Sequence, residues 1–197
     1  YCRYQIVWDD TYGAELAAEH LLSLGHTQIA VLAGDLVTER ISGFIKKCVE
    51  ANVYPMVFLS CREGDTEAQL QKRLPWYDRK RIITGSGLSS GELLALAMRY
   101  NAKTTAVYAR NDLIADAVLN KTRELNISVP NELSIMGYSD EIGNSWLSTI
   151  RVPIKDAINI CLADYFESLE KKTEPRSDSF ELPVELVIRG STGPVRR

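Results

Sequence analysis

Short apolar runs alternate with longer segments of helical periodicity along most of the chain, and this alternation is the feature that most constrains the fold. The clearest run is Ile29-Ala30-Val31-Leu32-Ala33, which ends in Gly34. A continuous apolar run of this length is typical of a strand buried on both faces of a parallel sheet. Similar runs predict further strands over residues 55–60, 104–109 and 133–138.

Segments of helical periodicity separate these runs. Asp9 and Asp10 are suited to cap a helix that runs to Leu24, because carboxylates accept hydrogen bonds from the free N–H groups of a first turn. Gly25 follows and is suited to end that helix. Further helices are predicted over residues 39–51, 90–100, 112–125 and 154–170. Extended segments are predicted over residues 4–8, 148–153 and 181–188.

Strands that alternate with helices of ten or more residues predict right-handed βαβ units. The expected fold class is therefore α/β, with a parallel sheet flanked by helices. A charged stretch over residues 62–81 interrupts the alternation and contains Pro75 and Trp76. We interpret it as a surface excursion with a short helix over residues 66–74.

The composition is that of an ordinary globular protein, with 197 residues, of which 45% are hydrophobic and 25% charged. A net charge of -3 gives no basic face for nucleic acid, so any DNA-contacting part is expected to lie elsewhere. The four cysteines form no metal or disulfide pattern, which favours a reducing cytoplasm. No apolar run is long enough to span a membrane. Because the chain opens at Tyr1 and not at a Met, it is expected to be part of a longer protein.

Catalytic residues, metal ligands and cofactor motifs are not found in the sequence. The only histidines, His20 and His26, are six residues apart and are interpreted as structural. The turn Gly85-Ser86-Gly87-Leu88 lacks the Lys-Ser/Thr of a phosphate-binding loop. An enzyme of flavodoxin-like shape would need a catalytic set that is missing here.

Several blocks of sequence occur in the order found in one family of bacterial regulators. They are Asp10-Thr11-Tyr12-Gly13 with Leu24-Gly25-His26, Glu39-Arg40-x-x-Gly43-Phe44, Asn111-Asp112, Val129-Pro130 with Leu133 to Tyr138, Ser148-Thr149-Ile150-Arg151, and Pro183 to Thr192. Each block alone is a weak signal, but together they cover most of the chain outside residues 54–85. The sequence resembles the lac repressor (LacI/GalR) family of transcriptional regulators.

The resemblance implies a periplasmic-binding-protein-like fold of type I, in which two subdomains are joined by three crossings. Residues 1–8 would be a remnant of the N-terminal subdomain, and residues 9–147 the C-terminal, effector-binding subdomain. Residues 148–175 would cross to the N-terminal subdomain, and residues 176–197 would return. The implied function is to sense an effector, a sugar or similar metabolite, by hinge closure that controls operator binding by a head absent from this chain. The alternative is a solute-binding protein of a sugar transport system.

Candidate ligand-binding residues follow predicted strands or begin predicted helices, and in a parallel sheet such positions gather at one edge. They are Arg40, Ser86, Asn111 and Ser139. The family resemblance assigns effector contacts to Arg40 and Asn111. The family usually has Asp-Asp where this chain has Ser139-Asp140, so the resemblance implies either a different ligand or a contact from Asp140.

Each assignment has a structural alternative. Arg40 would otherwise be a surface arginine paired with Glu39 or a neighbouring carboxylate. Asn111 would otherwise only cap a helix, a role that we expect for Asp112. For Ser86, a plain glycine turn is the favoured interpretation.

The resemblance also implies a homodimer, in which the helix after Asn111-Asp112 and the loop around Trp146 lie at the interface. The residues expected there are Asp116, Leu119 and Trp146. For Trp146, burial in the core of its own chain is the alternative.

Overall fold

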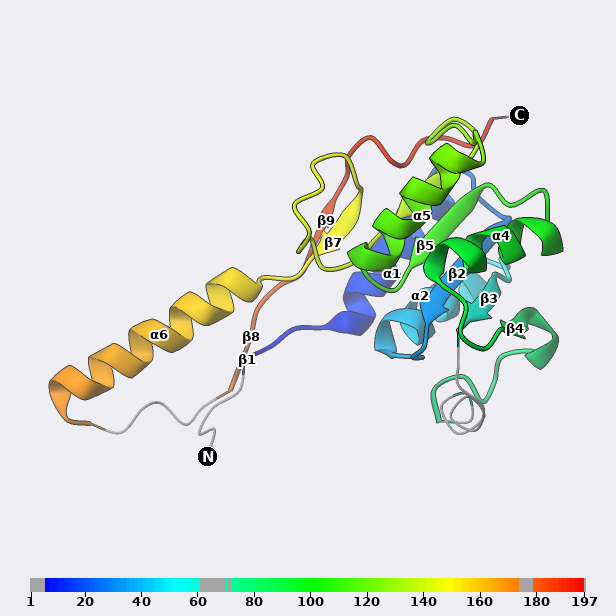
Figure 1. Cartoon of the computed structure of the whole chain (residues 1–197). Coiled ribbons are helices and arrows are strands. Elements are labelled where there is room, and N and C mark those ends of the chain that lie inside the picture. Colours follow the sequence, from blue (N-terminus) through cyan, green and yellow to red (C-terminus); the bar gives the residue numbers. More distant parts are fainter. Residues whose placement is uncertain (1–5, 61–69, 71, 174–178, 197) are drawn as a thin grey trace.

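A computed structural model describes residues 6–60, 70, 72–173 and 179–196. Its centre is a parallel sheet of five strands in the order β4-β3-β2-β5-β6 (Figure 1). These strands are β2 (Ile29–Gly34), β3 (Met56–Leu59), β4 (Ile82–Thr84), β5 (Ala106–Ala109) and β6 (Ser134–Met136). The expected α/β class with a parallel sheet is confirmed.

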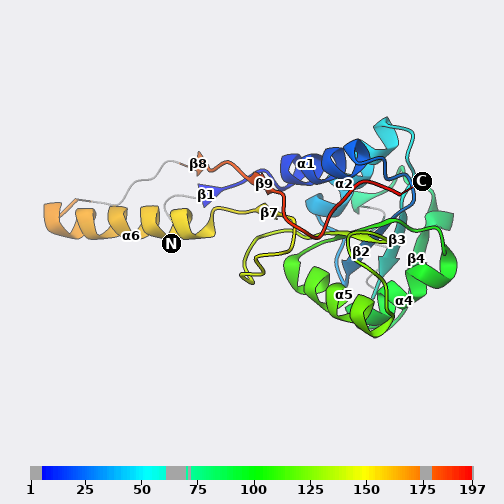
Figure 2. The same cartoon turned by 90° about the horizontal axis from the view of Figure 1, so that it is seen from above.

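Two pairs of helices cover the two faces of the sheet (Figure 2). Helices α1 (Asp10–Ser23) and α2 (Glu39–Glu50) pack on one face, and α4 (Ser90–Tyr100) and α5 (Asp112–Glu124) on the other. Strand β2 supplies both cores, because Val31 and Ala33 join the first cluster while Ala30 and Leu32 join the second. Burial on both sides explains why this strand has no polar alternation; each large side chain buried in this way contributes roughly 1.5 to 3 kcal/mol.

The helix ends follow the local chemistry of the sequence. Asp9 Oδ1 accepts a hydrogen bond from the Tyr12 amide at 2.8 Å, and Gly25 adopts a φ of +88° just after α1 ends. Helix α4 begins with a capping box in which Ser89 and Glu92 each bind the other's backbone amide. The expected start of α1, the stop at Gly25 and the span of α4 are confirmed.

Helix α6 (Ile154–Lys171) and a small pair of strands form an arm that projects from the main body (Figures 1 and 2). Strand β1 (Ile6–Val7) pairs in parallel with β8 (Phe180–Glu181) at the base of this arm. Strand β7 (Thr149–Arg151) pairs antiparallel with β9 (Glu185–Val187), and both contact α1. The arm is therefore connected to the body through β1, β7 and the return segment that leads into β9.

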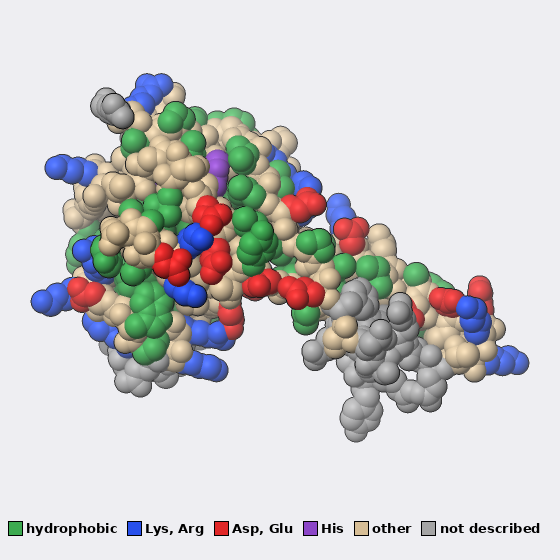
Figure 3. Space-filling view, turned by 180° about the vertical axis from the view of Figure 1, so that it is seen from behind, with side chains coloured by type: hydrophobic (Ala, Val, Ile, Leu, Met, Phe, Trp, Pro, Cys, Tyr) green, Lys and Arg blue, Asp and Glu red, His purple; other side chains and the backbone are tan. Residues whose placement is uncertain are grey.

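The exposed face of α6 is largely apolar. Five of its large hydrophobic side chains are exposed, namely Ile158, Leu162, Tyr165, Phe166 and Leu169. The space-filling view shows the arm standing clear of the body, with hydrophobic patches along it (Figure 3). Within the described residues, no helix is long and apolar enough to cross a membrane.

The sequence interpretation differs from the structure in two places. The edge strand β4 was not predicted, because Ile82-Ile83-Thr84 is too short to stand out from the charged stretch before it. The single strand predicted over 181–188 is wrong: β8 and β9 are separate and have different partners, since Pro183 lies between them and cannot donate to a sheet. Most of the short helix predicted over 66–74 lies outside the described residues.

Candidate functional site

Polar side chains gather at the carboxyl edge of the sheet, as the sequence predicts for a parallel α/β fold. Tyr138, two residues beyond β6, connects them. The Arg40 guanidinium carbon lies 4.2 Å from the centroid of the Tyr138 ring, and the Asp112 amide donates to the Tyr138 carbonyl at 2.9 Å. Arg40 and Ser139 are therefore adjacent to Tyr138 in space and in sequence, and Asn111 is brought to the same edge by its neighbour Asp112.

Arg40 lies in the first turn of α2 and is held from two sides. Its Nε donates to Asp10 Oδ1 at 3.1 Å, while Tyr138 supports the flat face of the guanidinium. The structural alternative paired Arg40 with Glu39 or a neighbouring carboxylate: Asp10 is such a carboxylate, whereas Glu39 pairs with Arg73. The Arg40 side chain is 20% exposed, so it is oriented by its neighbours and still open to a ligand at this edge.

The close approach of α1 and α2 sets the position of this ion pair. Gly43 in α2 lies against α1, where an added Cβ would be 3.0 Å from the Thr11 carbonyl oxygen. Gly13 in α1 leaves room for the Tyr138 hydroxyl, which a Cβ would meet at 2.3 Å. These two glycines allow Asp10, Arg40 and Tyr138 to lie within contact distance.

Asn111 takes the capping role that the sequence suggests for Asp112 and, as an alternative, for Asn111 itself. Asn111 caps α5, because its Oδ1 accepts from the Ile114 amide at 2.9 Å. Asp112 does not cap: it is 2% exposed and accepts a hydrogen bond from Thr149 Oγ1 at 2.6 Å. Burial raises the pKa of the Asp112 carboxyl, and the Thr149 hydrogen bond opposes that shift. The Asn111 amide nitrogen has no hydrogen-bond partner among the described residues, and it remains a donor for a ligand.

Ser139 and Asp140 form a turn with left-handed backbone angles, with φ of +110° and +57°. The Ser139 amide donates to the Ile150 carbonyl at 2.7 Å, and the residue is 4% exposed. The Asp140 carboxylate accepts from Arg151 Nε at 2.9 Å and from Arg189 Nη2 at 2.9 Å. Since two guanidinium groups occupy this carboxylate, its hydrogen bonds join parts of the chain, which argues against the expected contact with an effector.

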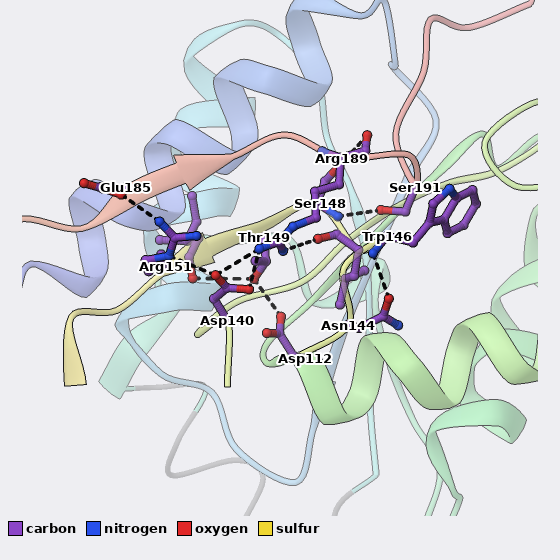
Figure 4. Close-up of polar contacts among 12 residues, drawn as sticks. Asp112, Asp140, Asn144, Trp146, Ser148, Thr149, Arg151, Glu185, Arg189 and Ser191 are labelled. Atoms are coloured by element: carbon purple, nitrogen blue, oxygen red, sulfur yellow. Dashed lines mark hydrogen bonds and ion pairs between the residues drawn. The ribbon is translucent and has the colours of Figure 1, made fainter. Parts of the chain in front are cut away.

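The polar contacts around Asp140 tie both crossing strands to the sheet (Figure 4). Arg151 comes from β7 and also binds Glu185 of β9 at 3.2 Å. Arg189 follows β9 and donates to the Leu147 carbonyl at 2.6 Å. The Ser148 amide also donates to Ser191 Oγ at 2.8 Å, which is a further link between the two crossing segments. We call Asp140, Arg151, Glu185 and Arg189 the crossover cluster.

A cavity of about 890 Å³ adjoins the crossover cluster, a size suited to a small molecule. Its lining includes Ser139, Asp140, Arg151 and Arg189, together with the start of α6 at 153–156. Arg40 and Asn111 do not line it. The cavity therefore lies between the body and the base of the arm, beside the edge that carries Arg40.

Ser86 stands apart from the other candidates. It follows β4, the outermost strand on its side of the sheet, and its side chain is exposed. Gly87 next to it has a φ of +70°, as a tight turn requires. The structure agrees with the glycine-turn interpretation.

The residues expected at a dimer interface differ in accessibility. Leu119 is 3% exposed and packs in the core between α5 and the sheet, so its assignment to an interface is wrong. Asp116 accepts from Asn144 Nδ2 at 3.0 Å, which joins α5 to the loop that precedes Trp146. Trp146 is 41% exposed, and its indole lies over Gly190, where a Cβ would be 2.0 Å from Nε1.

The two histidines fasten the C-terminal segment to the body. His20 Nε2 lies 2.9 Å from Thr192 Oγ1, and His26 Nε2 lies 3.0 Å from the Gly193 carbonyl oxygen. Burial lowers the pKa of both imidazoles. Among the described residues, no three His, Cys, Asp or Glu side chains are grouped as a metal site.

Comparison with known proteins gives a consistent set of relatives. Residues 18–192 match the model of the periplasmic binding protein-like domain family. The chain is 33% identical to the HTH-type transcriptional regulator DegA of Bacillus subtilis, over 96% of this chain and 52% of that protein. It is 29% identical to the HTH-type transcriptional repressor PurR of Aliivibrio fischeri, over 95% of this chain and 52% of that protein. The chain thus spans about half the length of these curated relatives.

Solved structures show the same fold. A LacI family transcriptional regulator from Enterococcus faecium with bound ribose superposes with a TM-score of 0.70 at 23% identity, over 97% of this chain and 66% of that one. A dimeric Lac repressor with a C-terminal deletion gives a TM-score of 0.69 at 22% identity, over 97% and 64%. The similarity extends across the body and the arm.

Proposed function

This chain belongs to the periplasmic binding protein-like domain family, in the form found in LacI-type regulators, and on that premise we propose that it is the effector-sensing region of a bacterial transcriptional regulator. The single observation that carries the proposal is the meeting of Arg40, Asn111 and Ser139 at one edge of the sheet. In this proposal the protein acts in the cytoplasm and is not an enzyme. The curated relatives are regulators, which favours this function over solute transport.

The remaining half of the protein would supply a second subdomain and a DNA-binding head. The exposed apolar face of α6 supports this, because five large hydrophobic side chains in one row need a cover. We assign residues 1–8 and 148–175 to the region that joins the N-terminal subdomain. Residues 9–147 and 176–197 then form the C-terminal subdomain.

Effector binding would close the two subdomains about the crossing strands and change the spacing of paired heads. Arg40 would bind hydroxyl or carboxylate oxygens with its planar set of donors. The Asn111 amide would donate a further hydrogen bond. A homodimer through α5 and the loop around Trp146 would present two heads to a two-fold symmetric operator.

The test compares this chain with the full-length regulator in calorimetric titrations against a panel of sugars. The chain alone should bind weakly or not at all, because half of the cleft is absent. In the full-length protein, Arg40→Ala should lower the affinity by roughly 1.5 to 3 kcal/mol, the contribution of a charged hydrogen bond.

Arg99→Ala is the matched control, since Arg99 is an exposed arginine in the last turn of α4, outside the proposed site and the proposed interface. Tight binding by the chain alone would show that the second subdomain is not needed. If the Arg40→Ala and control variants bind the effector with equal affinity, the role of Arg40 is structural.

A further inference from the structure

Arg110 is an arginine at the ligand edge that no sequence argument singled out. It follows β5 directly and precedes Asn111, so it lies at the middle of the carboxyl edge, beside β2. Its side chain is 17% exposed. Gly34, at the end of β2, lies beside the guanidinium: a Cβ there would be in ordinary contact with Arg110 Nη2, at 3.5 Å.

The hydrogen-bonding capacity of Arg110 is only partly used. Nη2 donates to Asp35 Oδ1 at 3.0 Å, but Asp35 is itself 72% exposed. The buried Nε has no partner within the described part of the chain. Thr38 Oγ1, just before α2, is also buried without a hydrogen-bond partner among the described residues. Buried polar atoms are nearly always paired in native proteins, so the unpaired Arg110 Nε indicates an acceptor still to be added.

The charges at this edge favour an anionic acceptor. The Tyr108 hydroxyl, two residues before Arg110 in the chain, donates to the Arg40 carbonyl at 3.3 Å, which places Arg40 beside the end of β5. Burial lowers the pKa of the Arg110 guanidinium, Asp35 opposes that shift, and Arg40 adds to it. Two guanidinium groups near one another are relieved by a shared anion. The nearby carboxylates are already engaged, Asp10 by Arg40 and Asp140 by the crossover cluster. At position 139, where the family usually has aspartate, this chain has an uncharged serine.

We propose that the effector carries an anionic group, a carboxylate or a phosphate, and that Arg110 binds it together with Arg40. The guanidinium plane can present Nε and one Nη to two oxygens of such a group. The inference rests on the proposed sensing function and narrows its ligand class from sugars in general to sugar acids or sugar phosphates. Arg110 is the residue that would select this class.

The experiment titrates the full-length regulator with matched ligands at constant ionic strength, followed by isothermal calorimetry. The neutral arm is D-glucose, D-galactose and D-ribose; the carboxylate arm is D-gluconate, D-galactonate and D-ribonate; and the phosphate arm is D-glucose 6-phosphate, D-galactose 6-phosphate and D-ribose 5-phosphate. Binding confined to an anionic arm is expected, and the arm that binds identifies the group. Tighter binding in the neutral arm would overturn the inference and leave the sensing function standing. Absence of binding in all three arms would count against both.

Variants of Arg110 then test its role. Arg110→Gln should weaken binding of the anionic ligand roughly 10- to 100-fold, as loss of a charged hydrogen bond requires. Arg110→Lys should retain part of the affinity, because it keeps the charge and loses the paired donors. Arg99→Gln removes the same charge from the last turn of α4, away from the ligand edge, and should bind as the unaltered protein does.

Thermal unfolding without ligand separates recognition from folding. If the Nε acceptor is a group of the second subdomain, Arg110→Gln will lower the ligand-free unfolding midpoint and affect neutral and anionic ligands equally. That pattern would overturn the proposal, and so would unchanged affinity for the anionic ligand.

Discussion

Asp140→Asn should lower the free energy of unfolding by more than the loss of an exposed ion pair would. The reason is that the Asp140 carboxylate joins both crossing segments to the sheet. Its side chain is 12% exposed and accepts hydrogen bonds from Arg151 and Arg189. Asparagine has nearly the same shape and tolerates the left-handed backbone that Asp140 adopts, with φ of +57°. The substitution therefore removes charge without straining the turn.

The magnitude follows from the exposure of the two partners. Arg189 is 19% exposed, so its bond to Asp140 counts as a partly buried charged hydrogen bond, about 1.5 to 3 kcal/mol. Arg151 is 47% exposed, and its bond adds little after screening by solvent, about 0 to 1 kcal/mol. Because asparagine can still accept one hydrogen bond, the expected loss in the free energy of unfolding is about 1.5 to 3 kcal/mol in total.

Glu185→Gln is the matched control, since it removes a carboxylate from the same cluster at a site that is 63% exposed. Its expected cost is below about 1 kcal/mol. Urea unfolding followed by circular dichroism measures both variants, with the slope against urea checked for constancy. If the two variants lose the same small amount, the crossover cluster is an ordinary surface network and the reasoning from burial is wrong.

Two further predictions concern the C-terminal segment and the dimer. Because burial lowers the pKa of His20 and His26, the unfolded chain binds more protons, so stability should fall as the pH drops below about 6.5. Thermal unfolding from about pH 7 to about pH 5 should show a shallower decline in a His20→Asn/His26→Asn variant, and an equal decline would assign the effect to carboxylates. Trp146→Ala should weaken dimerisation of the full-length protein in sedimentation equilibrium. The matched control is Trp76→Ala, because Trp76 is 51% exposed and lies outside the predicted interface. If the two variants have equal dimer dissociation constants, Trp146 does not belong to the interface.

The main elements of the fold could be predicted because their signals are local. Asp9 marks the start of α1 by its capping chemistry, and Gly25 marks its end by its turn chemistry. The run from Ile29 to Gly34 can be recognised as a buried strand without knowledge of its pairing partners. Strand β4 could not be found in this way, because its three residues form a strand only through pairing with β3. Its stability comes from tertiary contacts that a short window of sequence does not contain.

The site was predictable only as far as topology determines it. Parallel strands bring their carboxyl ends to one edge, so Arg40, Asn111 and Ser139 could be placed together without knowledge of their contacts. Which side chain of Asn111-Asp112 caps the helix depends on Thr149, which lies 37 residues beyond Asp112 in the sequence. Such pairings depend on rotamers and on segments distant in sequence, and no spacing rule encodes them.

Asp140 and Arg110 together support the proposal of an anionic effector. An aspartate that accepted effector hydroxyls would have to be free, but here Asp140 is held by Arg151 and Arg189, and the residue before it is a serine. The Asp140 carboxylate is therefore engaged within the chain, while the buried Nε of Arg110 has no partner among the described residues. Under the proposal, an anionic ligand would supply the missing acceptor, whereas a neutral polyol would bring no added counter-ion to the two guanidinium groups. The Asp140 carboxylate, which would not be free to bind a ligand, binds Arg151 of β7 and Arg189 after β9. Ligand recognition and the rigidity of the crossing segments would then depend on neighbouring residues of one turn.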